Sequence, residues 1–265
     1  MISKREKQIL LFFLKDKNKK NWFKIIKECT NLFISKKELP LHYISNLLYR
    51  ENVSNYKDYI SIKENNRLLA WSQSHAKEQI ILAENKLLFE ELLVKNNIPT
   101  PQIFFHNSKN RFTYKSDIFK IETKNDFFSF LEKVFYEEKI VQLFCKPIDG
   151  GMGQNIFVID RNTYRKITDN LINLLFSNAF IFQELILQHE VLKKINYSSI
   201  NTLRIFTYKN EKNELEILSG FIRIGRKGAI IDNAHAGGIL VPFNIKSGKM
   251  CAEGLQLIDN GGGIF

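Results

Sequence analysis

The ten residues 144–153 join a lysine to a glycine-rich turn. A short apolar run, which we expect to be a strand, ends at Lys146, and Gly150, Gly151 and Gly153 follow. Glycines at this density let backbone N–H groups point into one concavity, which suits phosphate oxygens, and the lysine adds a point charge beside them. The lysine precedes the glycines and a strand follows them, so this is neither a Walker A loop nor a dinucleotide-binding turn. The alternative is an ordinary hairpin turn beside a surface lysine.

Two arginines and an Asp-Asn pair in the last quarter of the chain are the other candidates for chemistry. Arg204 lies between two apolar residues of a predicted strand, where burial of an unpaired charge is costly, so a cleft role with an anionic partner is favoured. Arg223 lies on a neighbouring predicted strand. Asp232 and Asn233 either begin a turn or belong to the active site.

The elements that must hold these residues change in character along the chain. Residues 1–80 contain no glycine and carry apolar residues at spacings of three and four, which favours helices joined by short turns. One long helix is predicted over 77–97, ended by two asparagines and two prolines. Strands are predicted at 102–105, 117–121, 140–145, 155–159, 179–183, 203–208, 214–224 and 237–243, and helices at 125–138 and 163–176.

The net charge of +11 is concentrated in the first third of the chain. Residues 1–80 hold 16 Lys and Arg against 8 Asp and Glu. Because 30 of the 39 basic residues are lysines, whereas base and phosphate recognition in nucleic acids favours arginine, we expect no nucleic-acid partner. Either the basic region is a solvated helical surface, or it contacts an anionic membrane peripherally or a phosphate-bearing substrate.

Neither membrane insertion nor secretion is indicated by the sequence. No apolar run approaches the roughly 20 residues that span a bilayer, and no signal-peptide pattern opens the chain. The three cysteines, Cys29, Cys145 and Cys251, are too few and too scattered for a disulfide framework or a zinc site. We therefore expect a cytoplasmic protein.

The lysine and its glycine turn resemble the phosphate-covering loop of ATP-grasp enzymes. Upstream, Asn85-Lys86 and, after a helical stretch, residues 97–101 (Asn-Ile-Pro-Thr-Pro) resemble the helix and Gly-Ile-Pro link of the D-alanine–D-alanine ligase branch. In that branch a lysine at the position of Lys86 helps to bind nucleotide phosphate. Asn97 stands where the branch has glycine, and asparagine also tolerates left-handed backbone geometry.

Downstream, the resemblance extends to the nucleoside. Gln183, Glu184 and Leu185 resemble the hinge that receives adenine, and Glu190 stands where the family places a ribose-binding carboxylate. The series Asn-Thr-Leu-Arg ending at Arg204, then Arg223, then Asp232-Asn233 before a Gly-Gly pair is similar to the sugar-transfer-associated ATP-grasp family. The resemblance covers about residues 78–250.

The resemblance implies an α+β protein with an ATP-grasp fold and a helical N-terminal region. The expected division is a helical region over 1–77 and an ATP-grasp domain over 78–265, the latter split into 78–180 with the phosphate loop and an incomplete subdomain over 181–265. Family members are linked to capsule and cell-surface polysaccharide synthesis.

The chemistry implied by the resemblance is ATP-dependent ligation of a small molecule. A carboxylate attacks the γ-phosphate of ATP, and an amine or thiol captures the acyl phosphate. Lys86, Lys146 and the glycine loop hold the phosphates, Arg204 and Arg223 neutralise the transferring phosphoryl group, and Asn233 belongs to the active site. A sugar-linked acceptor is an alternative substrate. Two rival functions are a non-catalytic domain that only binds nucleotide or a partner, and a kinase on the same fold.

A magnesium site is also implied, but its ligands are not recognisable. ATP-grasp enzymes place metal-binding carboxylates near the end of the domain, because Mg²⁺ prefers oxygen ligands. After Asp232 the sequence offers only Glu253 and Asp259, and the last residues read as a glycine run and not as a closing strand. The sequence therefore predicts a C-terminally shortened domain with an incomplete metal site, with weak ATP binding and little Mg²⁺-dependent turnover.

Overall fold

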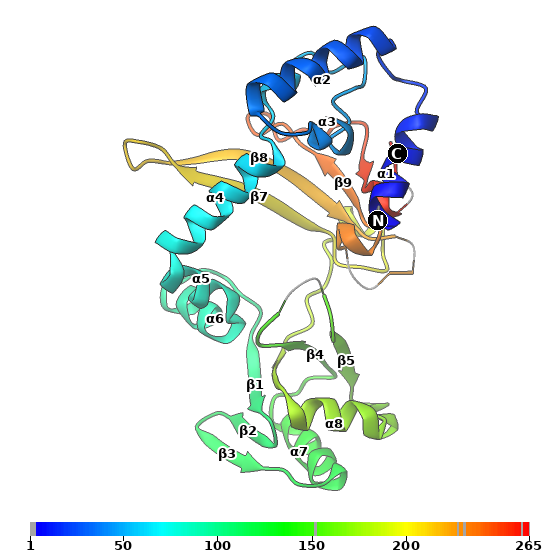
Figure 1. Ribbon diagram of the computed structural model, residues 1–265. Helices are drawn as coiled ribbons and strands as arrows, with labels where there is room; N and C mark the ends of the chain where they lie inside the picture. Colours follow the sequence, from blue (N-terminus) through cyan, green and yellow to red (C-terminus); the bar gives the residue numbers. More distant parts are fainter. Residues whose placement is uncertain (1–3, 151–152, 227, 230–231, 261, 265) are drawn as a thin grey trace. The chain divides into compact units, whose positions relative to one another are not determined.

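The computed structural model describes residues 4–150, 153–226, 228–229, 232–260 and 262–264 (Figure 1). The chain forms two compact units. Unit 1 comprises Met1–Lys77 and Asn201–Phe265, and unit 2 comprises Glu78–Ile200. Both units combine helices with antiparallel sheet, so the predicted α+β class is confirmed.

Unit 2 contains a six-stranded sheet in the order β3-β2-β1-β6-β4-β5, in which every neighbouring pair is antiparallel. The strands are β1 (Ile103–Ser108), β2 (Arg111–Tyr114), β3 (Asp117–Lys120), β4 (Gln142–Pro147), β5 (Phe157–Asp160) and β6 (Ala179–Gln183). The helices are α5 (Lys77–Glu84), α6 (Lys86–Lys95), α7 (Lys124–Glu137), α8 (Asp169–Ser177) and α9 (Glu190–Lys193), with a 3₁₀ turn η2 (Tyr164–Lys166).

Aromatic side chains from the strands and α7 form the core of unit 2. Phe105 of β1 and Phe182 of β6 are at most 1 % exposed, and their rings stack with centroids 4.2 Å apart. Phe112 and Phe130 contact the same cluster. Helix α7 begins in a capping box, in which the Thr123 hydroxyl accepts from Asp126 N and the Asp126 carboxylate accepts from Thr123 N.

Two helix predictions in this unit are wrong in their extent. The helix predicted over 77–97 is divided into α5 and α6, because the Asn85 carboxamide oxygen accepts from the backbone N–H groups of Leu87 and Leu88 and so starts a new helix. The helix predicted over 163–176 is η2 followed by α8, which Thr168 caps. Asn97, by contrast, adopts the expected left-handed conformation (φ 56°).

Unit 1 joins the helices of the first third to a second sheet. The helices are α1 (Lys4–Lys15), α2 (Trp22–Lys36), α3 (Leu41–Ser45) and α4 (Ile62–His75), with the 3₁₀ turns η1 (Tyr56–Asp58), η3 (Ala234–Ala236) and η4 (Ile258–Asn260). The five-stranded sheet has the order β11-β10-β9-β8-β7, from β7 (Thr202–Lys209), β8 (Leu215–Ile224), β9 (Ile239–Pro242), β10 (Leu255–Gln256) and β11 (Gly263–Ile264).

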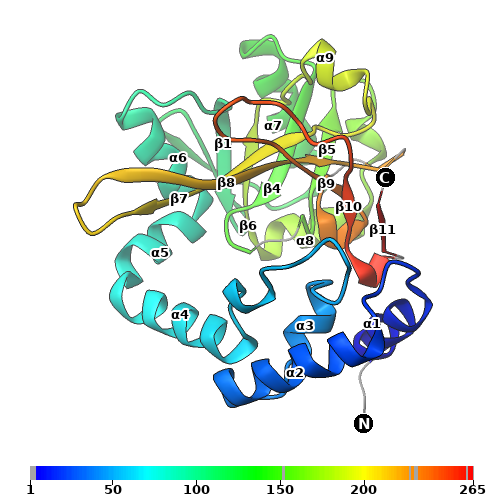
Figure 2. The same cartoon turned by 90° about the horizontal axis from the view of Figure 1, so that it is seen from above.

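The prediction that the chain ends in a glycine run without a closing strand is wrong. Gly263 and Ile264 form β11, which pairs with Gln256 and Leu255 of β10 (Figure 2). Backbone pairing needs no side chain, so a glycine-rich segment can complete a sheet edge that its composition does not suggest.

Candidate functional site

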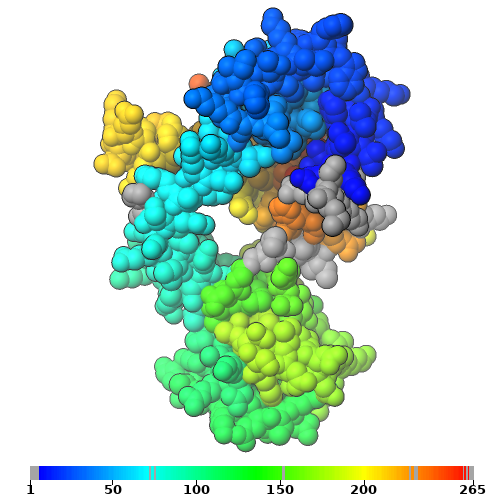
Figure 3. Space-filling model, viewed as in Figure 1, coloured from blue at the N-terminus to red at the C-terminus, as the bar shows by residue number. Residues whose placement is uncertain are grey.

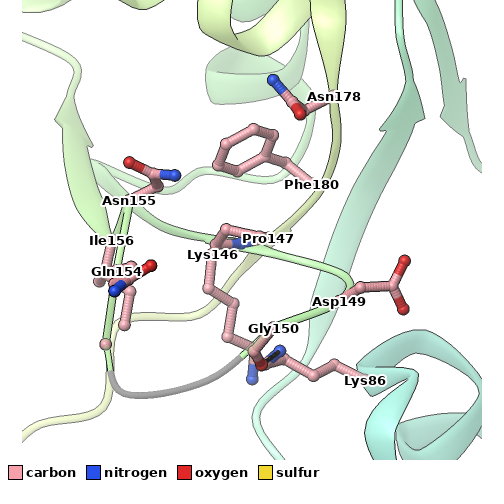
Figure 4. A pocket seen from close by; sticks show the side chains of 11 residues that line it. Lys86, Lys146, Pro147, Asp149, Gly150, Gln154, Asn155, Ile156, Asn178 and Phe180 are labelled. Atoms are coloured by element: carbon pink, nitrogen blue, oxygen red, sulfur yellow. Dashed lines mark hydrogen bonds between the residues drawn. The ribbon is translucent and has the colours of Figure 1, made fainter.

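The loop between β4 and β5 forms a pocket of about 210 Å³ in unit 2 (Figure 4). Lys86, Lys146, Gly150 and Gly153 line it, so the two predicted lysines and two predicted glycines do come together. Gly151 lies outside the described residues. The pocket therefore combines two ammonium groups with a glycine-containing turn, which is a chemistry suited to anionic oxygens.

Lys146 occupies the loop end of β4, and its ammonium forms an ion pair. Its Nζ donates to Glu90 Oε1 at 2.9 Å, and the side chains of Lys146 and Glu90 are 19 % and 8 % exposed. The sequence reasoning missed Glu90. Lys86, Leu87 and Leu93 are the other less exposed positions of α6, so Glu90 lies on the inward face of this helix. A carboxylate at a position where helical periodicity predicts an apolar residue was the signal in the sequence.

Lys86 ties the start of α6 to the glycine loop between β4 and β5. Its Nζ donates to Gly150 O at 2.7 Å and to Ile148 O at 3.2 Å, and its backbone N–H also donates to Ile148 O. Burial, assisted by the nearby Lys146 charge, lowers the pKa of the Lys86 ammonium, while Asp149 acts in the opposite sense. Figure 4 shows the Lys86 side chain reaching toward Gly150.

The loop needs glycine because of its backbone conformation. Gly150 has φ 94° and Gly153 has φ 75°, both in the left-handed region that side chains disfavour. A Cβ at Gly150 would meet no atom within 4 Å, so strain in the backbone and not a clash restricts this position to glycine.

The residues predicted for the nucleoside begin at the last residue of β6, Gln183, and differ in burial. Gln183 is 3 % exposed, and its Oε1 has no hydrogen-bond partner among the described residues. Glu184 is exposed and its N–H donates to Gln102 O, whereas Leu185 is half-buried. Glu190 begins α9 with its side chain 80 % exposed and pairs with Lys193. Gln183 thus offers a buried acceptor, and Glu190 an accessible carboxylate.

The arginine of β8 in unit 1 is held by two partners. Thr202 of β7 lies directly opposite Arg223 in the sheet register, so the two side chains share a face. Arg223 donates to Thr202 Oγ1 from Nε at 2.9 Å and from Nη2 at 2.7 Å. Its Nη2 also lies 3.4 Å from Asp232 Oδ1, and Asp232 Oδ2 accepts from Thr202 N and Oγ1.

The argument that placed Arg204 in a buried setting is wrong. Its neighbours Leu203 and Ile205 are 59 % and 48 % exposed, and Arg204 is exposed as well. The reason is that β7 is an edge strand, which pairs with β8 alone among the described strands, and the β7–β8 hairpin stands out as a group of yellow atoms (Figure 3). Asn233 caps η3, where its Oδ1 accepts from His235 N.

Carboxylates in the described residues do not assemble into a metal cage. No group of three or more His, Cys, Asp or Glu side chains lies close enough there to hold an ion. Asp232 is engaged by Thr202 and Arg223, Glu253 is exposed, and the side chain of Asp259 lies outside the described part. No cluster of carboxylates therefore identifies a Mg²⁺ site among the described residues, and we assign no residue to one.

The chain matches the family model for sugar-transfer associated ATP-grasp proteins over residues 67–263. It belongs to this ATP-grasp family, as its motifs indicated, and the family supports ATP binding and an ATP-dependent, ligase-like function on small molecules. No curated protein matches the chain. Among the described helices, none is both long and apolar enough to cross a membrane.

Proposed function

We propose that this protein uses ATP to join a carboxylate to an amine through an acyl phosphate, in the synthesis of a cell-surface polysaccharide. The pocket that brings Lys86 and Lys146 to the glycine loop carries the proposal, because it offers two cations and backbone N–H groups to phosphate oxygens. The family membership supports ATP as the source of those phosphates. The three free cysteines fit a reducing cytoplasm, where we place the reaction.

The proposed reaction has two steps. A carboxylate oxygen of the substrate attacks the γ-phosphorus, and the bond from γ-phosphorus to the β–γ bridging oxygen breaks to release ADP. The amine nitrogen then attacks the acyl carbon, loses its proton, and expels inorganic phosphate. Mg²⁺ is proposed to neutralise phosphate charge when bound, although its ligands in this chain are unassigned.

Each predicted residue takes a role in this proposal. Lys86, Lys146, Gly150, Gly151 and Gly153 bind the phosphates. Gln183 accepts a hydrogen bond from the adenine amine through its unpaired Oε1, Glu184 and Leu185 complete the hinge, and Glu190 receives the ribose hydroxyls. Arg204 and Arg223 neutralise the transferring phosphoryl group, and Asn233 is an active-site residue.

ATP affinity of a Lys146→Met variant tests the proposal. Loss of one charge-assisted phosphate contact should cost about 1.5–3 kcal/mol, or roughly ten- to a hundredfold in affinity. Lys95→Met, at the exposed C-terminal end of α6, is the matched control and should bind ATP like the wild type. ADP release over candidate carboxylate and amine acceptors then distinguishes ligation from hydroxyl phosphorylation. Unchanged ATP affinity in Lys146→Met would refute the phosphate role.

The outward face of α2 favours the membrane interpretation of the basic region. Phe23, Ile26 and Ile34 are 88 %, 60 % and 67 % exposed, while Ile25 and Leu32 on the other face are buried in the core. Residues 1–39 carry 11 Lys and Arg against 4 Asp and Glu. Exposed aromatic and aliphatic side chains beside lysines are typical of helices that lie on anionic lipid surfaces. We therefore propose peripheral membrane contact through α2.

Co-sedimentation with lipid vesicles tests this contact. Binding to phosphatidylserine-containing vesicles should exceed binding to phosphatidylcholine vesicles and fall between low and physiological salt. Phe23→Ser combined with Ile34→Ser should reduce it, whereas Leu215→Ser, which is also exposed but lies on β8, should not. Equal binding to both vesicle types, or none, would leave α2 as a solvated surface.

A further inference from the structure

Helix α6 buries a carboxylate against the sheet of unit 2. Glu90 is 6 % exposed, whereas its neighbours Phe89 and Leu92 are 38 % and 37 % exposed. Burial of a carboxylate is costly unless it is paired, and an apolar side chain of similar volume is often at least as stable at such a position. Packing alone therefore does not explain a glutamate at position 90.

Within the described part of the chain, the Glu90 carboxylate forms an ion pair with one cation, Lys146. Its Oε1 accepts from Lys146 Nζ at 2.9 Å, and its Oε2 has no hydrogen-bond partner among the described residues. The Lys146 ammonium, for its part, makes no other hydrogen bond or ion pair within the described part of the chain. The pair therefore lies at the pocket with spare bonding capacity on the ammonium.

We propose that Glu90 is a positioning residue that holds the Lys146 ammonium at the pocket for a phosphate ligand. Lysine carries its charge on a flexible four-carbon stem, so an unheld ammonium would sample many positions. An ammonium has three donors; Glu90 takes one, which leaves the other two for phosphate oxygens. This inference rests on the proposed function, since it assigns Lys146 to the phosphates of ATP.

Two substitutions separate the holding role from packing. Glu90→Leu removes both acceptors and keeps a similar volume, and it should weaken ATP binding by about tenfold, the worth of one charge-assisted hydrogen bond. Glu90→Gln keeps an acceptor without the charge and should weaken it less. Glu91→Gln, at the next and exposed position of α6, is the matched control and should leave affinity unchanged.

A double-mutant cycle with Lys146 gives the decisive readout. In a Lys146→Met background, Glu90→Leu should cause no further loss of ATP affinity, because nothing is left for Glu90 to hold. Adenosine, which has no phosphate, should bind the Glu90 variants as it binds the wild type. If Glu90→Leu fails to fold alone, the double variant, which leaves no unpaired charge, and Glu90→Gln still give the comparison.

The outcomes distinguish the two proposals. Wild-type or tighter ATP binding by folded Glu90 variants would overturn the positioning role, as would a loss that persists in the Lys146→Met background or extends to adenosine. If Lys146→Met itself binds ATP like the wild type, the proposed phosphate role fails and the positioning role fails with it. A loss in Lys146→Met without one in the Glu90 variants removes only the positioning role.

Discussion

The candidate cations of the two units differ in how many partners they have. In unit 2, Lys146 has one carboxylate partner and faces a pocket. In unit 1, Arg223 makes two hydrogen bonds to Thr202 and an ion pair with Asp232, all through its Nε and Nη2 atoms. Within the described part of the chain, Lys146 therefore keeps two of its three ammonium donors for a ligand, whereas Arg223 keeps its Nη1 donors and has part of its charge balanced by Asp232.

The sheets that carry these cations differ in the size of their hydrophobic cores. The sheet of unit 2 rests on a large aromatic cluster that includes Phe105 and Phe182, which fixes the strand that carries Lys146. The described sheet of unit 1 buries a cluster of three aliphatic residues, and its β7–β8 hairpin leaves Leu215 and Leu218 about 70 % and 69 % exposed. A closely packed sheet fixes the positions of its strands, so the end of β4 that carries Lys146 is set by the core of unit 2.

The largest expected effect tests this packing contrast. Phe182→Ala should destabilise unit 2 by about 3–5 kcal/mol, because it removes a fully buried ring from the aromatic stack. Ile217→Ala, on β8 and 50 % exposed, should change stability by less than about 0.5 kcal/mol. Hydrogen exchange of peptides from each unit during urea unfolding measures both. Equal losses of stability for Phe182→Ala and Ile217→Ala would show that the two sheets do not differ in packing.

A smaller effect is expected at Arg223, the cation that pairs with Asp232. Arg223→Leu leaves the buried Asp232 without its ionic partner and should destabilise unit 1 by about 2 kcal/mol. Arg204→Leu changes an exposed arginine on the adjacent strand and should have little effect. Because Trp22 and Trp71 both belong to unit 1, their fluorescence during urea unfolding reports on this unit. A similar cost for both variants would show that the Arg223 cluster is not structural.

The lysine that ties the pocket together should make nucleotide binding sensitive to alkaline pH. Burial lowers the pKa of Lys86 from its ordinary 10.5, so its ammonium loses its proton at a lower pH than an exposed lysine does. ATP affinity should therefore fall by about tenfold as pH rises through that lowered pKa, since one charged contact is lost. Lys86→Arg, which stays charged, should flatten this decline. An identical pH profile for the two proteins would exclude Lys86 as the titrating group.

The smallest effect concerns a histidine buried in unit 1. His42 is 2 % exposed with both ring nitrogens unpartnered among the described residues. Burial lowers its pKa below 6.5, Glu38 and Glu64 act to raise it, and Lys36 acts to lower it. The unfolded chain then binds a proton that the folded chain does not, so stability falls as pH drops below about 6.5.

Replacement of this histidine isolates its contribution. His42→Phe should reduce the loss of unit 1 stability at acidic pH, by no more than about 1 kcal/mol. His235→Phe, which changes an exposed histidine, should keep the wild-type pH dependence. The unfolding free energy measured from tryptophan fluorescence at several pH values decides between them. If the unfolding free energy depends on pH equally in the wild type and in His42→Phe, another group causes the acid sensitivity.

Local sequence determined the glycine loop between β4 and β5 and most of the elements around it. A strand, a lysine, three glycines and a second strand are neighbours in the chain, so their order predicts the turn without any distant contact. The left-handed Asn97 and the hairpin of β7 and β8 follow from residue type in the same way. The hydrophobic period did not predict the helix break at Asn85, because a cap acts through one side chain and does not alter the spacing of apolar residues.

Only the tertiary structure decided the electrostatic partners and the exposure of the strands. Glu90 and Lys146 are 56 residues apart, and Thr202 and Asp232 are 30 apart, so no local pattern pairs them. Arg204 looked buried from its apolar neighbours, but strand order placed it on an exposed edge. Spacing along a chain fixes which face a residue occupies, whereas the element packed on that face, and hence the partner and the burial of each charge, depends on how distant segments come together.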